Sequence, residues 1–146
     1  MSGEPAIRVL LVEDDEDDFL ITQELLAEIS CQRFQLDWAK NFESGLEAMI
    51  RNQHDLTLVD YRLGAQNGIQ LLKTALERGC SSPVILLTGL SEHLIDLQAM
   101  EAGAADYLVK DRLDSDALER SIRYALQRQR AAVLATAEHR EPAAPI

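Results

Sequence analysis

Carboxylates, a hydroxyl and an ammonium group stand at the ends of four short apolar runs in this 146-residue chain. These residues are Glu13, Asp14, Asp60, Thr88 and Lys110. Three carboxylates at close quarters would repel one another, which raises a pKa or attracts a cation. Oxygen ligands without His or Cys select a hard ion, and a small site completed by water and phosphate suits Mg²⁺ better than Ca²⁺. One divalent ion would offset the pocket's charge of about −2, so that the site could accept a phosphoryl group.

Each of these polar residues also has an ordinary explanation when it is taken alone. An aspartate such as Asp60 is common where a strand ends in a turn. The chemical interpretation therefore depends on a fold that brings the four run ends together.

The apolar runs alternate with segments of helical periodicity along the chain. Short runs rich in Leu, Val and Ile, bounded by polar residues, predict buried strands. We predict strands over residues 7–12, 34–39, 55–60, 83–88 and 105–110. Apolar residues spaced by three and four predict helices over about 15–30, 42–50, 69–79 and 94–103, and from 115 past 130.

Near-continuous apolar strands are buried on both faces, which predicts a parallel sheet with helices on each side. Because crossovers are right-handed, the alternation favours an α/β, flavodoxin-like, doubly wound five-stranded sheet in the order 2-1-3-4-5, with an extended last helix. In that order the first and third strands are neighbours, and ligands bind beyond the carboxyl ends of the strands. We therefore expect the polar run ends to meet in one crevice.

Length and composition predict a single domain. With 47% apolar residues, 146 residues suffice for one full core. We expect a flexible lead over 1–6, a folded domain over 7–130, and a helix extension with a disordered tail over 131–146.

The net charge of −11 would repel phosphate backbones and anionic membrane surfaces, so neither nucleic acid nor membrane is an expected partner. Cys31 and Cys80 lie outside any CxxC pattern, which predicts reduced thiols. No apolar run approaches transmembrane length, and the N-terminus lacks the blocks of a signal peptide. We therefore expect a cytoplasmic protein.

Six consecutive acidic residues follow the first predicted strand. The first two, Glu13 and Asp14, are expected to end that strand. The others begin a helix, where acidic side chains complement the helix dipole, and we interpret Asp17 and Asp18 as a solvated helix start. No chemistry is assigned to three histidines that lack ligand-like spacing or a triad partner: His54, His93 and His139.

Four ordered motifs resemble the receiver domains of two-component response regulators, and in particular the single-domain chemotaxis regulators. The motifs are Leu-Leu-Val-Glu13-Asp14, Leu-Val-Asp60 with Gly68 eight residues later, Leu-Leu-Thr88-Gly89, and Asp-Tyr107-Leu-Val-Lys110. The resemblance covers about residues 7–130, and each motif lies at a predicted strand exit.

The resemblance implies that Asp60 accepts a phosphoryl group from a histidine kinase or a histidine phosphotransfer protein. A carboxylate nucleophile would form a mixed anhydride in that reaction. Glu13, Asp14 and Asp60 are implied to hold Mg²⁺, with Mn²⁺ as an alternative ion. The main-chain carbonyl of Arg62 is a further implied ligand.

The resemblance also implies a conformational switch. Thr88 and Lys110 contact the phosphoryl group, Thr88 moves toward it, and Tyr107 turns inward. This reshapes the face of the fourth helix, fifth strand and fifth helix, which binds a downstream protein or a second copy. The alternative for Tyr107 is an aromatic half-buried on an edge strand. Arg62 and Leu90 stand where the family controls water access, and their bulk predicts slow hydrolysis of the phosphate.

Two departures from the family pattern affect the loops. The family usually has proline after the lysine, whereas Asp111 follows Lys110 here. A cis bond without proline costs about 3–4 kcal/mol, so we predict a trans bond and a rearranged loop. Gly64 stands where many members carry proline, which predicts a looser loop after Asp60.

The leading function is a phosphorylation-operated switch that is no enzyme apart from catalysing its own phosphorylation and dephosphorylation. A phosphate-independent interaction module with the same fold is the alternative, which retention of all five site residues argues against. A hydrolase of the haloacid dehalogenase type would need an aspartate at Arg62 and a cap domain.

Two interpretations of the last helix stay open. Its apolar stripe could continue through Leu126 and Val133 into a dimeric coiled coil, although Gln129 interrupts it; the ordinary interpretation is a helix packed on its own sheet. Four arginines form either a docking face or helix-end charge compensation: Arg120, Arg123, Arg128 and Arg130.

Overall fold

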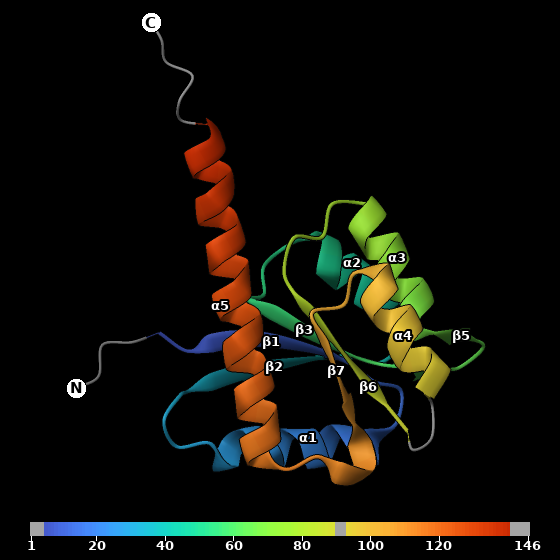
Figure 1. Ribbon diagram of the computed structural model, residues 1–146. Coiled ribbons are helices and arrows are strands. Elements are labelled where there is room, and N and C mark those ends of the chain that lie inside the picture. Colours follow the sequence, from blue (N-terminus) through green and yellow to red (C-terminus); the bar gives the residue numbers. More distant parts are fainter. Residues whose placement is uncertain (1–4, 90–92, 141–146) are drawn as a thin grey trace, which may run out of the picture.

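The computed structural model describes residues 5–89 and 93–140, and its centre is a parallel sheet in the order β2-β1-β3-β6-β7 (Figure 1). The strands are β1 (Ile7–Val12), β2 (Phe34–Ala39), β3 (Leu56–Asp60), β6 (Val84–Thr88) and β7 (Asp106–Val109). The helices are α1 (Glu16–Glu28), α2 (Phe42–Ile50), α3 (Gly68–Glu77), α4 (His93–Ala102) and α5 (Ser115–Arg140). The predicted fold class and strand order are confirmed.

Two hydrophobic clusters fill the space between the sheet and its helices. α1 and α5 cover one face of the sheet, and α2, α3 and α4 cover the other (Figure 1). Because neighbouring strand residues point to opposite faces, β1 contributes Leu10 and Val12 to one cluster and Val9 and Leu11 to the other. All four side chains are buried. This explains why the strand is apolar at every position.

Side chains at the helix starts satisfy the free backbone N–H groups there. Asp15 caps α1 by accepting from the N–H of Asp17 at 2.8 Å. Asn67 caps α3 in a reciprocal box with Gln70. Asp15 lies just beyond the carboxyl end of β1, and Asn67 is the last residue of β5, so both caps help to fix the segments around the crevice.

The register aligns the carboxyl ends of the central strands. Val12 pairs with Val59, and Asp60 pairs with Leu87. The last residues of β1, β3 and β6 consequently meet at one edge, as the predicted order requires.

The segment after Asp60 differs from the expected loose loop. Its residues form a small antiparallel hairpin, β4 (Arg62–Leu63) with β5 (Gln66–Asn67). Gly64 lies in the turn at φ +66, a left-handed conformation that glycine adopts without a Cβ clash. Proline cannot reach this φ, which explains why glycine suits the hairpin.

Gly68 lets α3 start directly against the end of β3. A Cβ at this position would lie 2.6 Å from the main-chain oxygen of Asp60 and 2.8 Å from Leu86 Cδ1. The N–H of Gly68 donates to the carbonyl of Tyr61 at 2.7 Å. Close backbone packing at Gly68 thus fixes the segment that carries Asp60.

We expect Gly68→Ala to lower the free energy of unfolding by about 2 kcal/mol, because the added methyl group overpacks this contact. Urea denaturation measures the loss. Gly64→Ala is the control: the space around it is open, so only the strain of positive φ is added, about 1 kcal/mol. A smaller loss for Gly68→Ala than for Gly64→Ala would contradict the close approach.

The first half of α5 packs on the sheet, and its end projects beyond it (Figure 1). Leu118, Ile122 and Ala125 are buried, and the side chain of Gln129 donates to the carbonyl of Ser81 at 2.7 Å. Val133 is exposed. As far as Gln129, α5 is therefore a helix packed on its own sheet, which was the ordinary interpretation. Gln129 is also the residue at which the apolar stripe was predicted to break.

The remaining predictions about the chain have mixed outcomes. Residues 131–140 are helical, whereas the predicted tail beyond them and residues 1–4 of the lead lie outside the described residues. Cys31 and Cys80 are free thiols, as predicted. Among the described residues, no helix combines the length and apolarity that crossing a bilayer requires.

Candidate functional site

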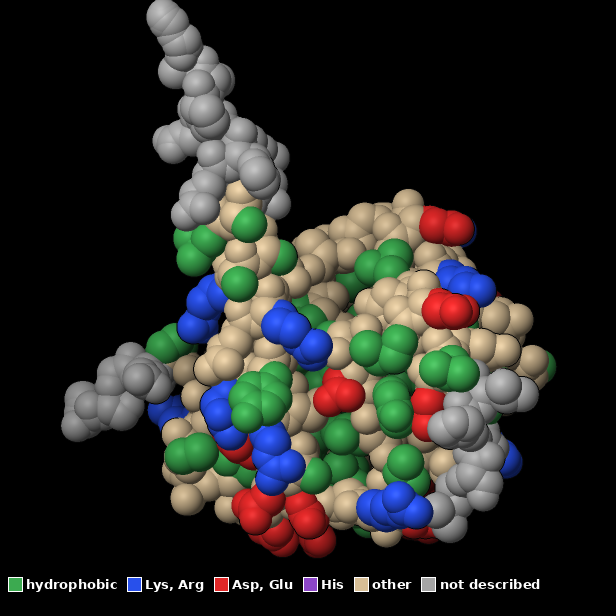
Figure 2. Space-filling view, viewed as in Figure 1, with side chains coloured by type: hydrophobic (Ala, Val, Ile, Leu, Met, Phe, Trp, Pro, Cys, Tyr) green, Lys and Arg blue, Asp and Glu red, His purple; other side chains and the backbone are tan. Residues whose placement is uncertain are grey.

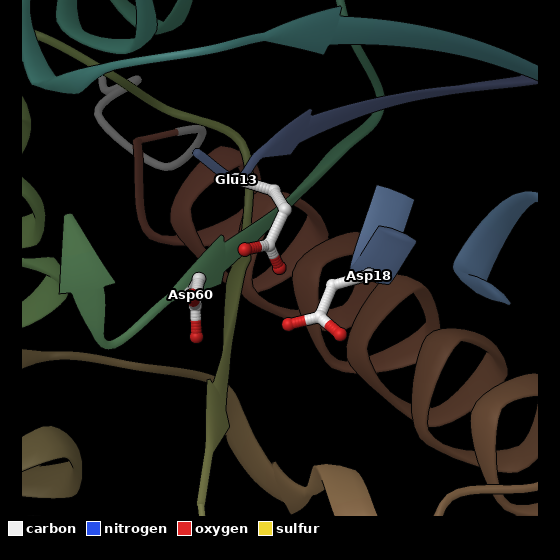
Figure 3. Close-up of side chains that lie close together, drawn as sticks. All are labelled: Glu13, Asp18 and Asp60. Carbon is white, nitrogen blue, oxygen red and sulfur yellow. The ribbon is translucent and has the colours of Figure 1, made fainter. Parts of the chain in front are cut away.

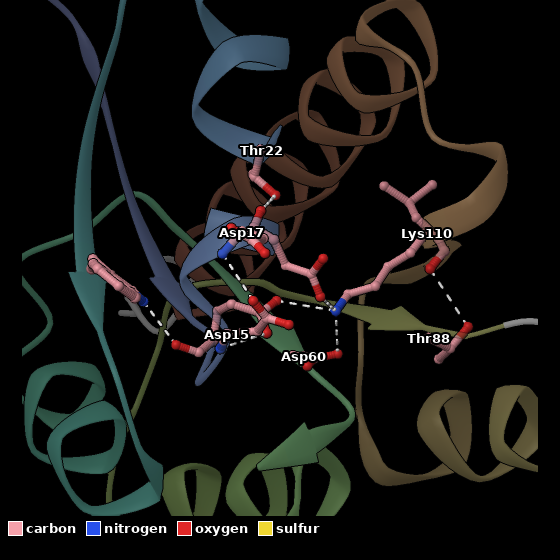
Figure 4. A network of polar contacts seen from close by, with 10 residues as sticks. Asp15, Asp17, Thr22, Asp60, Thr88 and Lys110 are labelled. Atoms are coloured by element: carbon pink, nitrogen blue, oxygen red, sulfur yellow. Dashed lines mark hydrogen bonds and ion pairs between the residues drawn. The ribbon is translucent and has the colours of Figure 1, made fainter. Parts of the chain in front are cut away.

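The ammonium of Lys110 lies among carboxylates at the carboxyl edge of the sheet (Figure 4). Its Nζ is 3.1 Å from Asp60 Oδ1, 3.1 Å from Glu13 Oε1 and 2.6 Å from Asp18 Oδ2. Lys110 follows β7 in a short 3-10 helix, η1 (Lys110–Arg112). Three segments that are distant in sequence thus bring their ionic ends to one place, as the doubly wound order predicts.

Contacts from neighbouring segments hold Glu13 at the end of β1. Its carbonyl accepts from the indole N–H of Trp38 at 2.7 Å. Its carboxylate accepts from the N–H of Asp15 at 3.3 Å. Trp38 in turn stacks on Phe19 of α1, with ring centroids 4.2 Å apart. The turn between β1 and α1 is therefore fixed from the edge strand β2.

Asp18 belongs to the same site. Figure 3 shows its carboxylate on the side of α1 that faces Glu13 and Asp60, and oxygen atoms of the three residues lie within 4.8 Å of one another. The interpretation of Asp18 as a solvated helix start is wrong. The first turn of α1 lies over the strand ends, so a side chain one turn past the Asp15 cap reaches Lys110.

Burial controls the electrostatics of this cluster. Glu13 is fully buried and Asp60 nearly so. Burial, followed by the charge of Asp60, raises the pKa of Glu13 to about 8. Burial also raises the pKa of Asp60, although hydrogen bonds with Glu13 and Lys110 oppose the increase. Without a cation the site therefore retains a proton on Glu13 at neutral pH.

Lys110 remains charged in this environment. Burial by itself lowers the pKa of its ammonium, but the hydrogen bond to Asp18 and the charges of Asp60 and Glu13 raise it above the ordinary value overall. One ammonium thus faces the carboxyl groups of Glu13, Asp18 and Asp60, and the cluster keeps an excess of acidic groups.

The carboxylates fit a divalent cation. Oε1 of Glu13 is buried without a hydrogen bond, because its contact with Lys110 is an ion pair outside hydrogen-bond geometry. A hard cation with oxygen ligands would satisfy this atom. The group that could hold a metal is Glu13, Asp18 and Asp60. Asp14, which the resemblance assigned to the metal, is exposed and outside this group.

A family model described as the response regulator receiver domain matches residues 9–123. The chain belongs to this family. The predicted resemblance to receiver domains is therefore confirmed.

Relatives of this receiver domain are response regulators. The chain is 33% identical over 104 residues to the transcriptional regulatory protein DltR of Streptococcus agalactiae, covering 71% of this chain and 45% of DltR. It is 32% identical over 124 residues to the regulatory protein AtoC of Escherichia coli, covering 85% of this chain and 26% of AtoC. The chain thus spans about half or less of the length of these relatives. Because some are named transcriptional regulators, the comparisons do not support excluding nucleic acid from the partners.

Solved structures of receiver domains share the fold. A response regulator receiver domain from Clostridium thermocellum superposes with a TM-score of 0.76 at 22% identity, covering 86% of this chain and 98% of that one. A CheY-like receiver domain from Methanospirillum hungatei gives a TM-score of 0.75 at 23% identity, covering 88% and 99%. These likenesses confirm the architecture of the receiver domain.

Thr88 and Tyr107, the two predicted switch residues, lie on neighbouring strands of the sheet. Thr88 is buried at the end of β6, and its hydroxyl donates to the carbonyl of Leu108 at 3.5 Å rather than to the acidic cluster. Tyr107 is half-buried and packs against the cluster beneath α3 and α4. The predicted movements of both residues stay predictions.

The loop after Lys110 follows the predicted departure from the family. The bond between Lys110 and Asp111 is trans, and η1 leads into α5. Arg62 lies on β4, and its backbone forms a hydrogen bond that lowers the pKa of Asp60. Leu90 lies outside the described residues, as do the side chains of His93 and His139. His54, to which no chemistry was assigned, pairs with Asp37 at 2.7 Å.

Proposed function

We propose that Asp60 of this receiver domain accepts a phosphoryl group in a Mg²⁺-dependent reaction, and that this modification switches partner binding. The observation that carries the proposal is the distance of 3.1 Å between Lys110 Nζ and Asp60 Oδ1, inside a buried acidic cluster. A cation this close can offset charge on a group that is transferred to the carboxylate.

The transfer itself needs one nucleophile. An oxygen of the Asp60 carboxylate forms a bond to the donor's phosphorus, while the bond from phosphorus to the donor's leaving atom breaks and that atom keeps the electron pair. The leaving atom is an imidazole nitrogen in a phosphohistidine donor and an acetate oxygen in acetyl phosphate. The product is a mixed anhydride. Positioning and charge compensation supply the catalysis, so the chain promotes its own phosphorylation and dephosphorylation.

Glu13, Asp14 and Asp60 are the proposed Mg²⁺ ligands, with the carbonyl of Arg62, and Mn²⁺ could replace the ion. When bound, the ion would offset charge on the transferring phosphoryl group. The buried Glu13 oxygen that lacks a hydrogen bond supports Glu13 as a ligand.

The proposed donors of the phosphoryl group are a histidine kinase or a histidine phosphotransfer protein in the cytoplasm.

The proposed binding surface is the face of α4, β7 and α5, which would bind a downstream protein or a second copy of the chain. Apolar side chains are exposed there (Figure 2), among them Leu97, Met100 and Tyr124. In α5, Arg128 donates to the carbonyl of Ala105 at 2.6 Å and Arg123 pairs with Glu119. We also propose that Arg62 and Leu90 slow the hydrolysis of the phosphate. The proposed limits of the folded domain are residues 7 and 130.

Mass spectrometry of the intact chain tests the reaction with acetyl phosphate as a small donor. We expect a gain of one phosphoryl mass with Mg²⁺ and no gain when EDTA removes the ion. No gain under either condition, in folded protein, would favour the phosphate-independent interaction module. An equal gain in EDTA would contradict the metal requirement.

A further inference from the structure

Among the described residues, Asp18 makes the shortest polar contact of Lys110. The ammonium donates to Asp18 Oδ2 at 2.6 Å, compared with 3.1 Å to the carboxylates of Glu13 and Asp60. We propose that Asp18 is a positioning residue that holds Lys110 in the unphosphorylated state and competes with the phosphoryl group for its ammonium. The inference rests on the function proposed above and concerns regulation of the same site.

The number of N–H groups on Lys110 explains the competition. An ammonium has three N–H donors, and three carboxylates lie within 3.1 Å of its nitrogen. The contact with Asp18 has hydrogen-bond geometry, whereas the contacts with Glu13 and Asp60 are ion pairs, so a phosphoryl oxygen that takes this N–H group competes with Asp18. Glu13 and Asp60 would be directed toward a bound cation, so Asp18 is the partner that Lys110 must leave.

Exposure also singles out Asp18 as the carboxylate that can be released. Its side chain is 35% exposed, whereas those of Glu13 and Asp60 are 0% and 7% exposed. Water can therefore replace Lys110 at Asp18 at low cost in solvation. Asp18 is carried by α1 rather than by a strand end, so its release leaves the sheet unchanged.

Asp18 disfavours the phosphorylated state in two ways. Its carboxylate withdraws Lys110 from the phosphoryl oxygens, and its negative charge repels them. Removing this charge while keeping the shape of the side chain should therefore favour phosphorylation, provided that Mg²⁺ is saturating.

The experiment compares the wild-type chain with Asp18→Asn and with the control Asp17→Asn. Asp17 carries the same charge in the same helical turn and is exposed. Acetyl phosphate is the donor, Mg²⁺ is saturating, and intact mass gives the rate. We expect Asp18→Asn to be phosphorylated about fivefold faster, the equivalent of one partly exposed ion pair, and Asp17→Asn to match the wild type.

A double-mutant cycle with Lys110→Gln separates this role from a general structural effect. Affinity for beryllofluoride with Mg²⁺, a non-covalent mimic of the phosphoryl group, is measured by calorimetry in all four proteins. The gain from Asp18→Asn should be larger with Lys110 present and shrink, in the Lys110→Gln background, to the part caused by charge repulsion alone. An equal gain in both backgrounds, or no gain in folded Asp18→Asn, overturns the role of Asp18. A wild-type chain that is never phosphorylated overturns the proposed function, and this inference with it.

Discussion

Replacing Asp60 with Asn is expected to abolish the gain of phosphoryl mass and to stabilise the fold in the absence of metal. The amide lacks the nucleophilic carboxylate that forms the anhydride. The same change removes one buried charge from a cluster in which a single ammonium contacts three carboxyl groups. Lys110 keeps Glu13 and Asp18 as partners, so no cation is left uncompensated. We expect the free energy of unfolding to rise by about 1 kcal/mol.

Intact mass after treatment with acetyl phosphate and urea denaturation in EDTA measure the two effects. Asp55→Asn is the matched control, because Asp55 immediately precedes the opposite end of β3, where its carboxylate accepts from the N–H of Arg8 at 2.9 Å. This control should be phosphorylated like the wild type and lose about 1 kcal/mol. Phosphorylation that persists in Asp60→Asn would place the acceptor on another residue.

Stability without metal should fall as the pH rises toward 8, while Mg²⁺ affinity should rise over the same interval. Glu13 has a pKa of about 8 in the folded chain, against an ordinary value of 4.5. Between these values the folded state holds a proton that the unfolded state has lost. The free energy of unfolding therefore decreases with increasing pH, by at most about 1.4 kcal/mol per pH unit. Below the ordinary value both states are protonated, and the stabilisation is fully present.

Metal binding should show the opposite trend, because a cation must displace the Glu13 proton. Affinity for Mg²⁺ is expected to increase by up to about tenfold per pH unit and to level off above pH 8. Urea denaturation in EDTA and calorimetric titration with Mg²⁺, at intervals from pH 5.5 to about 9, follow both trends. Glu13→Gln should flatten the two pH profiles. A wild-type stability that rises over this range would contradict the assignment of the proton to Glu13.

Most of the site could be predicted because its residues are the ends of buried strands. Apolar runs located Asp60 and Lys110 at strand exits, and the rules of parallel sheets placed those exits together. Asp18 could not be placed in this way. Its direction depends on how α1 lies over the strand ends, and contacts such as the stack of Phe19 on Trp38 set that angle. A signal was present in the acidic first turn of a helix that starts at the carboxyl edge of the sheet.

The hairpin after Asp60 was missed for a different reason. β4 and β5 have two residues each, too few to show the alternation that predicts a strand. The positive φ of Gly64 was equally hidden, because glycine favours a loose loop and a tight turn alike. Local turn geometry therefore had to come from the structure.

Trp38 gives this protein a built-in optical probe. It is the single tryptophan of the chain, and its indole N–H donates to the carbonyl of Glu13 at 2.7 Å. The ultraviolet-excited fluorescence of Trp38 in the unlabelled chain thus reports on the turn that carries the acidic residues. Emission changes during titration or phosphotransfer can be followed in real time, without a dye or an engineered reporter.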